Sequence, residues 1–378
     1  MAFNLEVVKT KQQLKVFIDF RHDLFKDDPQ YVPELFIAQR DMLTKGKHPS
    51  HAHIEYKLFL LYQDQKVCGR IAGIYNHNHN KFTGNKDGFF GFFDVINNEQ
   101  AAEKLLNAAA DFLSTKKVNN IIGPVDFSTN DPAGLLVEGF DAPPKVMMTY
   151  AKPYYQNLLD QLGFTKQMDL FAYWVGVDDI PQRVVSLAEK IEDRLLKRGI
   201  KLRKVNMKNF KEEVKNIRNI YNAAWEKNWG FVPMTDEEFD YVAKDMKMIM
   251  DEDFILVAEK DGAPIGFTLT IPNVNEVLID VKRGRLLPTG IFKLLFNKSK
   301  IKSLRVITLG ILEEYRSLGI EVCFYVRLMK KAKEKGYIGG EASWILENNQ
   351  MMNRGLQNIN SKVYKKYRLY EKSVSEVV

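Results

Sequence analysis

A β-hairpin pattern that occurs twice is the feature that most constrains the fold of this chain. Residues 57–75 (KLFLLYQDQKVCGRIAGIY) and residues 253–272 (DFILVAEKDGAPIGFTLTIP) each predict a strand, a two-residue polar turn and a second strand. Gly69 and Gly266 take equivalent places in the two hairpins, 197 residues apart (266 − 69). One supersecondary unit therefore appears once in each half of the chain.

The segments after the hairpins extend this repeat. Apolar residues at helical spacing predict one helix over residues 99–116 and another over residues 318–335. Each predicted helix is followed by an extended stretch, a further helix and a strand. With 378 residues, the chain is long enough for two domains of ordinary size. We therefore expect two copies of one α/β fold, residues 1–178 and 179–378, joined by a linker over residues 176–181 that leads into a helix at residues 182–198.

The most informative segment for function is LGILEEYRSLGI, residues 309–320, which predicts a strand, a polar turn and a helix. The start of a helix leaves backbone N–H groups unpaired and carries roughly half a positive charge, so an anion is stabilised there. Gly319 supplies space in the turn. This arrangement is suited to a pyrophosphate group.

These residues resemble the cofactor loop of the GNAT superfamily of N-acyltransferases, which reads Arg/Gln-x-x-Gly-x-Gly/Ala. Here the loop is Arg316-x-x-Gly319-x-Glu321, with glutamate in place of the last small residue. The ending Leu162-Gly163-Phe164 of the first half is similar to the family's Leu-Gly-Phe corner. The resemblance implies two tandem GNAT-like domains, each with a mixed, mainly antiparallel sheet flanked by helices.

The resemblance also implies acetyl-CoA or another acyl-CoA as co-substrate, bound by the second half. Asn349 occupies the place of a family asparagine that helps to bind the cofactor arm, whereas Leu356 stands where the family has its general-acid tyrosine. In the first half, Asn97 and Asn98 replace the glycine-bearing turn, which makes that half a degenerate copy. The expected cofactor-binding residues are Leu312, Arg316, Ser317, Leu318, Gly319, Ile320 and Asn349.

Glu341 is the candidate general base, because it begins the strand that borders the acceptor cleft in the family, with Ser343 beside it. A solvated surface glutamate explains the same position. The other acid–base candidates are Glu313, Glu314, Glu347, Tyr364, Tyr367 and Tyr370, of which the tyrosines are also compatible with cross-strand packing.

Aromatic residues cluster in WEKNWGFVP, residues 225–233, at the end of a predicted helix. Such a cluster either fills a core or lines a pocket. The resemblance places this region, together with Trp344, beside the acceptor, so Trp225, Trp229, Phe231 and Trp344 are the candidate substrate-binding residues. The implied reaction is acyl transfer to a small-molecule amine or a lipid-like acceptor. The alternative is a non-catalytic GNAT-fold protein that binds an acyl-CoA or another metabolite.

The net charge of +7 suits an anionic ligand, and no nucleic-acid motif accompanies it. The segment GIFKLLFNKSKI, residues 290–301, predicts an amphipathic helix, for which contact with a membrane surface and packing in the core remain open.

Cys68 and Cys323 lie among apolar residues, which indicates buried free thiols, and no signal-peptide pattern is evident, so we expect a cytoplasmic protein. The histidine pairs His51/His53 and His77/His79 lack supporting ligands, and we expect no metal site.

Overall fold

The computed structural model describes residues 2–226 and 228–377 and divides into two compact units. The first unit comprises Met1–Leu170, Val277–Phe296 and Lys365–Val378, and the second comprises Phe171–Glu276 and Asn297–Tyr364. The sequence predicted one boundary, between residues 178 and 179. That boundary describes the units incompletely, because residues 277–296 and 365–378 of the second half belong with the first unit.

The first unit has a sheet with the strand order β1-β2-β3-β4-β5-β13, and β6 also pairs with β13. The pair β4–β5 is parallel and the other pairs are antiparallel. Its elements are β1 (Phe3–Val7), α1 (Lys11–Leu24), α2 (Phe36–Leu43), β2 (Ile54–Gln63), β3 (Lys66–Asn76), α3 (His77–Thr83), β4 (Asp87–Val95), α4 (Glu99–Ser114), β5 (Asn120–Gly123), β6 (Leu135–Glu138), α5 (Tyr154–Gln161) and α10 (Ile291–Phe296), with the larger part of β13 (Lys362–Ser373).

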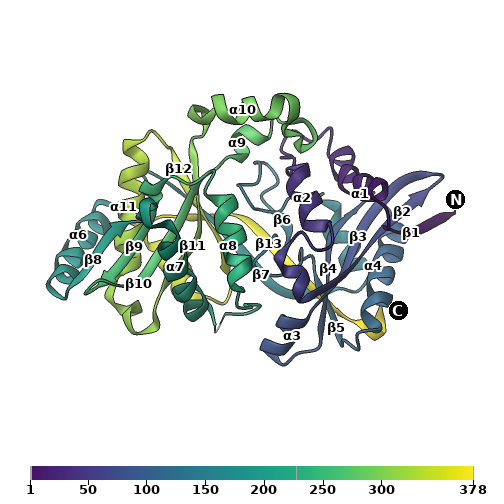
Figure 1. The fold of residues 1–378 in the computed structure, drawn as a ribbon, viewed down its shortest axis with the longest axis horizontal. Helices are drawn as coiled ribbons and strands as arrows, with labels where there is room; N and C mark the ends of the chain where they lie inside the picture. Colours follow the sequence, from purple (N-terminus) through teal and green to yellow (C-terminus); the bar gives the residue numbers. More distant parts are fainter. Residues whose placement is uncertain (1, 227, 378) are drawn as a thin grey trace. The chain divides into compact units, whose positions relative to one another are not determined.

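Helices cover both faces of this sheet (Figure 1). Helix α4 approaches one face so closely that a Cβ atom on Gly73 would lie 3.2 Å from the carbonyl oxygen of Ala109, which explains the glycine. On the other face, the guanidinium of Arg70 donates to the carbonyl of Phe17 in α1, with 3.0 Å between Nη1 and O. The sheet is therefore buried from both sides.

The second unit has the strand order β7-β12-β11-β10-β9-β8. Its parallel pair is β11–β12, the counterpart of β4–β5, while β8–β9, β9–β10 and β10–β11 are antiparallel. Its elements are the second half of β7 (Thr165–Gly176), α6 (Gln182–Lys197), β8 (Ile200–Lys204), α7 (Phe210–Trp225), α8 (Asp236–Met246), β9 (Ile255–Lys260), β10 (Ala263–Pro272), the start of α9 (Asn275–Leu278), β11 (Ser303–Ile311), α11 (Ile320–Glu334), β12 (Gly339–Leu346) and α12 (Gln350–Asn358).

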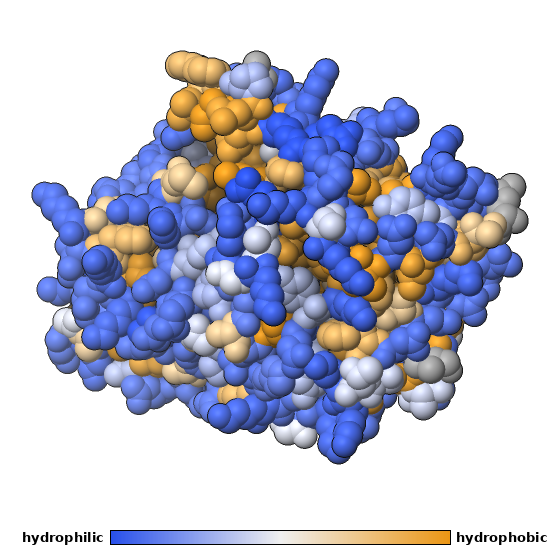
Figure 2. All heavy atoms as spheres, turned by 45° about the vertical axis from the view of Figure 1, so that its right-hand side comes forward, coloured by the Kyte–Doolittle hydropathy of each residue, from blue (hydrophilic) through white to orange (hydrophobic). Residues whose placement is uncertain are grey.

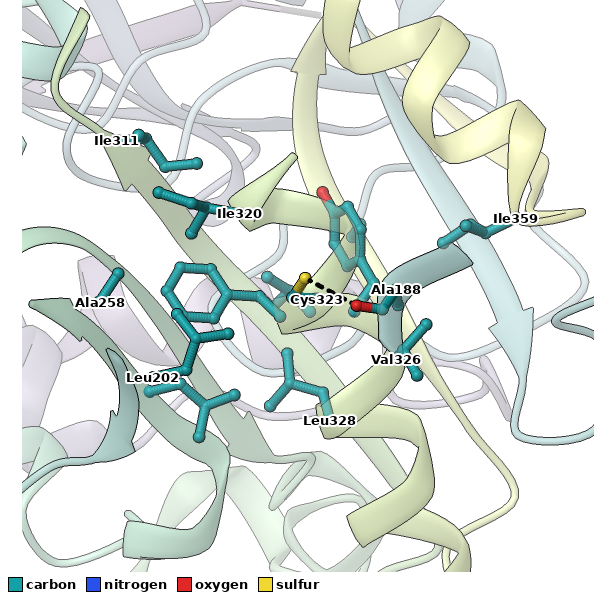
Figure 3. Close-up of a cluster of buried hydrophobic side chains, with 14 of the residues drawn as sticks. Ala188, Leu202, Ala258, Ile311, Ile320, Cys323, Val326, Leu328 and Ile359 are labelled. Carbon is teal, nitrogen blue, oxygen red and sulfur yellow. Dashed lines mark hydrogen bonds between the residues drawn. The ribbon is translucent and has the colours of Figure 1, made fainter. Parts of the chain in front are cut away.

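Helices α6 and α11 pack together against one face of the second sheet. Figure 3 shows Ile320, Cys323 and Val326 of α11 in this core, and the thiol of Cys323 donates to the carbonyl of Ala188 in α6, with 3.5 Å between S and O. Helix α7 packs on the opposite face, through Ile217 and Ile220 against Phe267 of β10.

The two units exchange their last strands. Strand β13 comes from the second half of the chain, yet Tyr370 in it pairs with Gly123 of β5 in the first unit. Strand β7 comes from the first half, yet the second unit includes Phe171 onward, and β7 neighbours β12 in its sheet. Tyr367 and Tyr370 are buried and pair across strands, in agreement with the packing alternative, but their partner strands β6 and β5 come from the first half of the chain.

Most locally encoded elements agree with the sequence predictions. Both hairpins form, with turns at Asp64-Gln65 and Asp261-Gly262. The predicted helices appear as α4, α6 and α11, each shortened by one to three residues. Cys68 and Cys323 are buried free thiols, as predicted.

Candidate acyl-CoA site in the second unit

The turn between β11 and α11 has the geometry of an anion site. It passes through a 3-10 turn, Glu313–Leu318, and reaches Gly319 with φ +77°, a left-handed conformation that favours glycine. Gly319, the N-cap residue of α11, has no side chain with which to cap the helix. The first N–H groups of a helix have no acceptor within the helix, and a phosphate oxygen is a suitable external one.

Two of the predicted cofactor residues hold this turn in place through their own bonds. The guanidinium of Arg316 donates to the carbonyl oxygens of Ile311 and Ala224, at 3.1 and 2.8 Å. The backbone N–H of Leu312 donates to Ile265, with 3.0 Å between N and O. Arg316 thus ties the turn to β11 and to the last turn of α7.

Glu321 occupies the position where the family loop has a small residue. Its side chain is half-buried, and Oε2 has no hydrogen-bond partner among the described residues. Desolvation by burial raises the pKa of this carboxyl. The hydroxyl of Tyr325, one helical turn later, also lacks a partner among those residues. The protein therefore encloses unsatisfied polar atoms beside the candidate phosphate site.

The parallel pair of the second unit separates next to this turn. Its register ends at Val306 and Ala342, although β11 continues to Ile311 and β12 to Leu346. Oγ1 of Thr308 and Nε1 of Trp344, in the diverging parts of the two strands, have no hydrogen-bond partner among the described residues. Buried polar atoms are nearly always paired in proteins, so unsatisfied ones on both strands indicate a place for a ligand.

The corresponding parallel pair of the first unit stays together. The N–H of Val125 donates to the carbonyl of Phe90 at 2.8 Å, and the N–H of Phe92 donates to Oδ1 of Asp126 at 2.6 Å. A Cβ atom on Gly91 would lie 2.1 Å from the carbonyl oxygen of Val125, so the segments are in direct contact. Helix α4 is capped by Asn98, which accepts from the N–H of Ala101. In the first unit, contacts within the protein therefore occupy the two positions that correspond to the strand separation and to the start of α11 in the second unit.

Glu341 and Ser343, the two candidate catalytic residues, meet in a buried polar cluster. The hydroxyl of Ser343 donates to Oε1 of Glu341 at 2.5 Å, and the hydroxyl of Tyr364 donates to Oε2. Nε of Arg305 donates to the hydroxyl of Ser343 at 3.0 Å and lies 3.9 Å from Glu341. The side chain of Glu341 is 0% exposed, so it is not a solvated surface glutamate.

Arg305 is a functional candidate that the sequence reasoning missed. Its signal was an arginine in the middle of the apolar strand SLRVITLG, where a charge is rare unless it is paired. Tyr364, which the sequence offered only as one of several acid–base candidates, is the half-buried member of this cluster. It also contacts the ring of Trp174 edge to face, with 6.2 Å between ring centroids.

The aromatic cluster after α7 combines core and surface positions. Phe231 is buried, whereas Trp225 and Trp229 are half-buried. Trp225 stacks on Tyr221 with 4.8 Å between ring centroids, and it covers Gly310 of β11 so closely that a Cβ atom there would lie 2.3 Å from its ring. Trp225 therefore forms a wall over the part of β11 that has left β12.

The remaining predicted contacts at α12 have local roles. Asn349 caps α12, since its Oδ1 accepts from the N–H of Met352 at 3.1 Å. Leu356 is buried in the core shared by α6 and α11. Asn353 instead links this region to β7, because its Oδ1 accepts from the hydroxyl of Tyr173 at 2.8 Å.

Among residues 2–226 and 228–377, no group of three or more His, Cys, Asp or Glu side chains is arranged to hold a metal ion. None of the helices in that same part of the chain is long and apolar enough to cross a bilayer.

Two relatives of known name align along almost the whole chain. Protein YghO of Escherichia coli K12 is 35% identical over 370 residues, which cover 96% of this chain and 94% of YghO. The bacterial ceramide synthase of Caulobacter vibrioides is 35% identical over 375 residues, which cover 97% of this chain and 96% of the synthase. No protein-family model matches the chain.

Among solved structures, the tandem GNAT protein from the clavulanic acid biosynthesis pathway matches 99% of this chain and 99% of its own, with a TM-score of 0.58 and 10% identity. At this identity the likeness establishes the fold alone, and it confirms the tandem GNAT architecture and the mixed sheets expected from the sequence.

Proposed function

This chain belongs to the family of the bacterial ceramide synthase and protein YghO, and from that premise we propose that it is an acyl-CoA-dependent N-acyltransferase acting on a long-chain amine. Ceramide is the N-acyl derivative of a long-chain amino alcohol. The observation that carries the proposal is the separation of β11 from β12 next to the uncapped start of α11.

Acyl-CoA binding is supported by two features that only the second unit has. The first turn of α11, entered through Gly319, offers backbone N–H groups to the pyrophosphate. The gap between the strands, bordered by the unsatisfied atoms of Thr308 and Trp344, would admit the extended arm that ends in the thioester. Of the predicted cofactor residues, Ser317, Leu318, Gly319 and Ile320 contribute through their backbone, and Leu312, Arg316 and Asn349 support the turn and the neighbouring helix.

The chemistry assigned to the polar cluster is proton transfer from the acceptor amine. Glu341 is the base, and because both of its oxygens already accept from hydroxyl groups, the proton reaches it through Tyr364 or Ser343. The neutral amine then attacks the thioester carbonyl, so that a C–N bond forms, the C–S bond breaks, and the nitrogen releases its second proton to water. Leu356 cannot protonate the departing thiolate, and we assign that role to Tyr364, the half-buried phenol of the cluster, which recovers its proton from Glu341.

The acceptor class rests on the name of one relative and on the aromatic wall. The half-buried ring of Trp225 lies over Gly310 of β11 and stacks on Tyr221, and such an apolar wall suits an alkyl chain better than a compact polar amine. Phe231 is buried behind Tyr221 and supports this wall, with the half-buried Trp229 nearby in sequence. The free thiols of Cys68 and Cys323 support a reducing, cytoplasmic location.

An assay with defined substrates tests the proposal. The purified protein is incubated with palmitoyl-CoA and sphinganine, and mass spectrometry measures the N-acyl product while a thiol reagent measures free CoA. Acetyl-CoA and octanoyl-CoA establish the preferred chain length. Thermal unfolding with each acyl-CoA measures binding separately, because a ligand at a hundredfold its Kd stabilises by roughly 2.7 kcal/mol.

The outcomes separate the two functions left open by the sequence. Product formation with stoichiometric CoA release supports the transferase. A thermal shift with no product from any long-chain amine indicates a binding protein that has lost the chemistry, for which Glu321 and Leu356 provide a reason. Absence of both a shift and a product with all three acyl-CoAs rejects the acyl-CoA site.

A further inference from the structure

Residues 282–296 form an arm whose base is fixed to the first unit. At the base, Nη2 of Arg285 lies 2.8 Å from Oδ1 of Asp19 in α1, and Nη1 of Arg283 lies 2.5 Å from Oδ1 of Asp23. Burial alone would raise the pKa of Asp19, but Lys15, Arg285 and Arg283 outweigh it and lower that pKa. The guanidinium of Arg285 also stacks over Phe36, 3.4 Å from the ring centroid.

The backbone of the base is in equally close contact with the first unit. Gly284 has φ +62°, and a Cβ atom there would lie 1.8 Å from the carbonyl oxygen of Glu34. No other residue fits at this point without moving the backbone. The arm therefore starts from a fixed position rather than from a loose loop.

The tip of the arm is apolar and exposed. Leu287 is 78% exposed, Phe296 77%, and Phe292 and Leu295 each 57%. The rings of Phe292 and Phe296 are parallel, 6.3 Å apart, on α10. Figure 2 shows apolar atoms gathered at the top of the molecule, where Figure 1 places α10. The predicted helix over residues 290–301 is shorter than expected, and its packing into the core is contradicted by these exposures.

The charged side chains of the segment that carries the tip are mainly cationic. Residues 277–302 contain seven cationic side chains and one acidic one, Asp280. Lys282 is exposed in the arm, and the chain continues from the tip into the exposed residues Lys298 and Lys300. Exposed phenylalanine and leucine next to lysine are the pattern of segments that lie in the interface of an anionic bilayer.

We propose that this arm docks the protein on an anionic lipid bilayer, with Leu287, Phe292, Leu295 and Phe296 entering the interface. A second copy of the chain is a poorer occupant, because each copy carries a formal charge of +7 and would set lysines against lysines. An anionic lipid surface covers the apolar tip and neutralises the lysines together. The inference does not depend on the proposed transferase activity.

Vesicle sedimentation with the full-length protein tests the docking. The protein is mixed with vesicles of phosphatidylcholine containing about 30% phosphatidylglycerol, and with pure phosphatidylcholine vesicles, at low and high salt. We expect binding to the anionic vesicles that weakens as salt rises. The double variant Phe292→Ser/Phe296→Ser should lose on the order of tenfold or more in partitioning, because two large apolar side chains leave the interface.

A matched control uses exposed apolar residues outside the arm. Phe82→Ser/Leu196→Ser removes two side chains that are 41% and 50% exposed, and it should bind vesicles as the wild type does. Lys298→Glu/Lys300→Glu should abolish the preference for anionic vesicles while leaving the apolar tip intact. Thermal unfolding midpoints verify that all variants are folded, which we expect because the substituted side chains are exposed.

Three outcomes overturn the proposal. They are wild-type protein that ignores anionic vesicles at low salt, a Phe292/Phe296 variant that binds as well as the wild type, and a control variant that loses as much binding as the arm variant. Sedimentation velocity tests whether a second copy of the chain binds the tip instead. If the wild type dimerises and the arm variant does not, the tip is a dimer contact and the membrane assignment is wrong.

Discussion

The hydroxyl of Ser343 lies 2.5 Å from Oε1 of Glu341 and donates to it, while the hydroxyl of Tyr364 donates to Oε2 of the same carboxyl. A carboxylate with 0% exposure is costly unless its oxygens are satisfied, and here two hydroxyl groups and the nearby Arg305 satisfy it. Such a group is held in one orientation before any substrate arrives. The predictions about chemistry start from this cluster.

We predict that Glu341→Gln lowers kcat for acyl transfer on the order of a hundredfold or more, with little change in the thermal shift produced by acyl-CoA. Glutamine is similar in shape but cannot accept a proton from the amine. Tyr364→Phe should reduce kcat as well, because it interrupts the path to Glu341. Steady-state kinetics and thermal unfolding are measured on the same preparations.

Glu347→Gln is the matched control for this prediction, since Glu347 directly follows the strand that carries Glu341, six residues (347 − 341) further along the chain. Its kcat should stay within a few-fold of the wild type. Full activity in Glu341→Gln would remove Glu341 from the catalytic assignment and leave the cluster a structural role.

Gly319→Leu should abolish the thermal shift caused by acyl-CoA. The side chain would crowd the start of α11, where even an added Cβ atom would lie 3.0 Å from Cδ1 of Ile191. Gly336→Leu is a strict control, because Gly336 has the same φ of +77° but has nothing within 4 Å. Both variants carry a similar backbone cost of roughly 1–2 kcal/mol, because each places a side chain in the left-handed region. An equal loss of the shift in both would show that general destabilisation, not the phosphate site, is responsible.

Glu321→Gln should increase affinity for acyl-CoA. Burial raises the pKa of the Glu321 carboxyl, so its charged form is already disfavoured, and a phosphate near the start of α11 would disfavour it further. The gain should be larger at pH 8 than at pH 5, because the wild-type carboxyl is ionised at the higher pH. Isothermal titration at both pH values measures it, with Glu334→Gln at the other end of α11 as control. Weaker binding by Glu321→Gln would mean that the carboxyl is a ligand contact.

Asp126→Asn should stabilise the protein more at pH 8 than at pH 5. Burial, followed by the charge of Glu34, raises the pKa of Asp126 to about 7, although Arg70 and Arg21 oppose this. An aspartate in the unfolded chain titrates near 3.9, so the wild type loses stability as pH rises from about 4 to about 7. Asparagine stays neutral and still accepts from the N–H of Phe92.

Thermal unfolding across this pH range checks the prediction, and Asp141→Asn is the control because Asp141 is exposed. The midpoint of Asp126→Asn relative to the wild type should rise by a few degrees between pH 5 and pH 8. A difference that does not change with pH would show that Asp126 is ionised in the folded protein throughout.

Local signals in the sequence were sufficient for the elements and for the repeat. The alternation of apolar residues around Asp64-Gln65 and Asp261-Gly262 predicted both hairpins, and helical spacing with Gly319 and Gly336 at the ends predicted α11. The chemistry of a turn or a helix end depends on residues close in sequence. Such features can therefore be predicted from the chain itself.

Which strands pair, and which buried groups meet, depended on the tertiary structure. Both halves end in a strand of similar pattern, so periodicity does not predict that Tyr370 pairs with Gly123 from the other half of the chain. The sequence shows glycines in both β4 and β11. Only the folded structure shows that Gly91 of β4 lies against the backbone of Val125, whereas the pairing of β11 with β12 ends at Val306 and Ala342.

The same limit applies to the site. From the sequence by itself came the turn at Gly319 and the candidates Glu341 and Ser343. Only the folded chain placed Arg305 and Tyr364 around Glu341, 36 (341 − 305) and 23 residues away in sequence, and used Arg316 to hold the turn. Burial and electrostatic pairing depend on distance in space, and residues far apart in the chain acquire a definite distance only when the sheets and helices have packed.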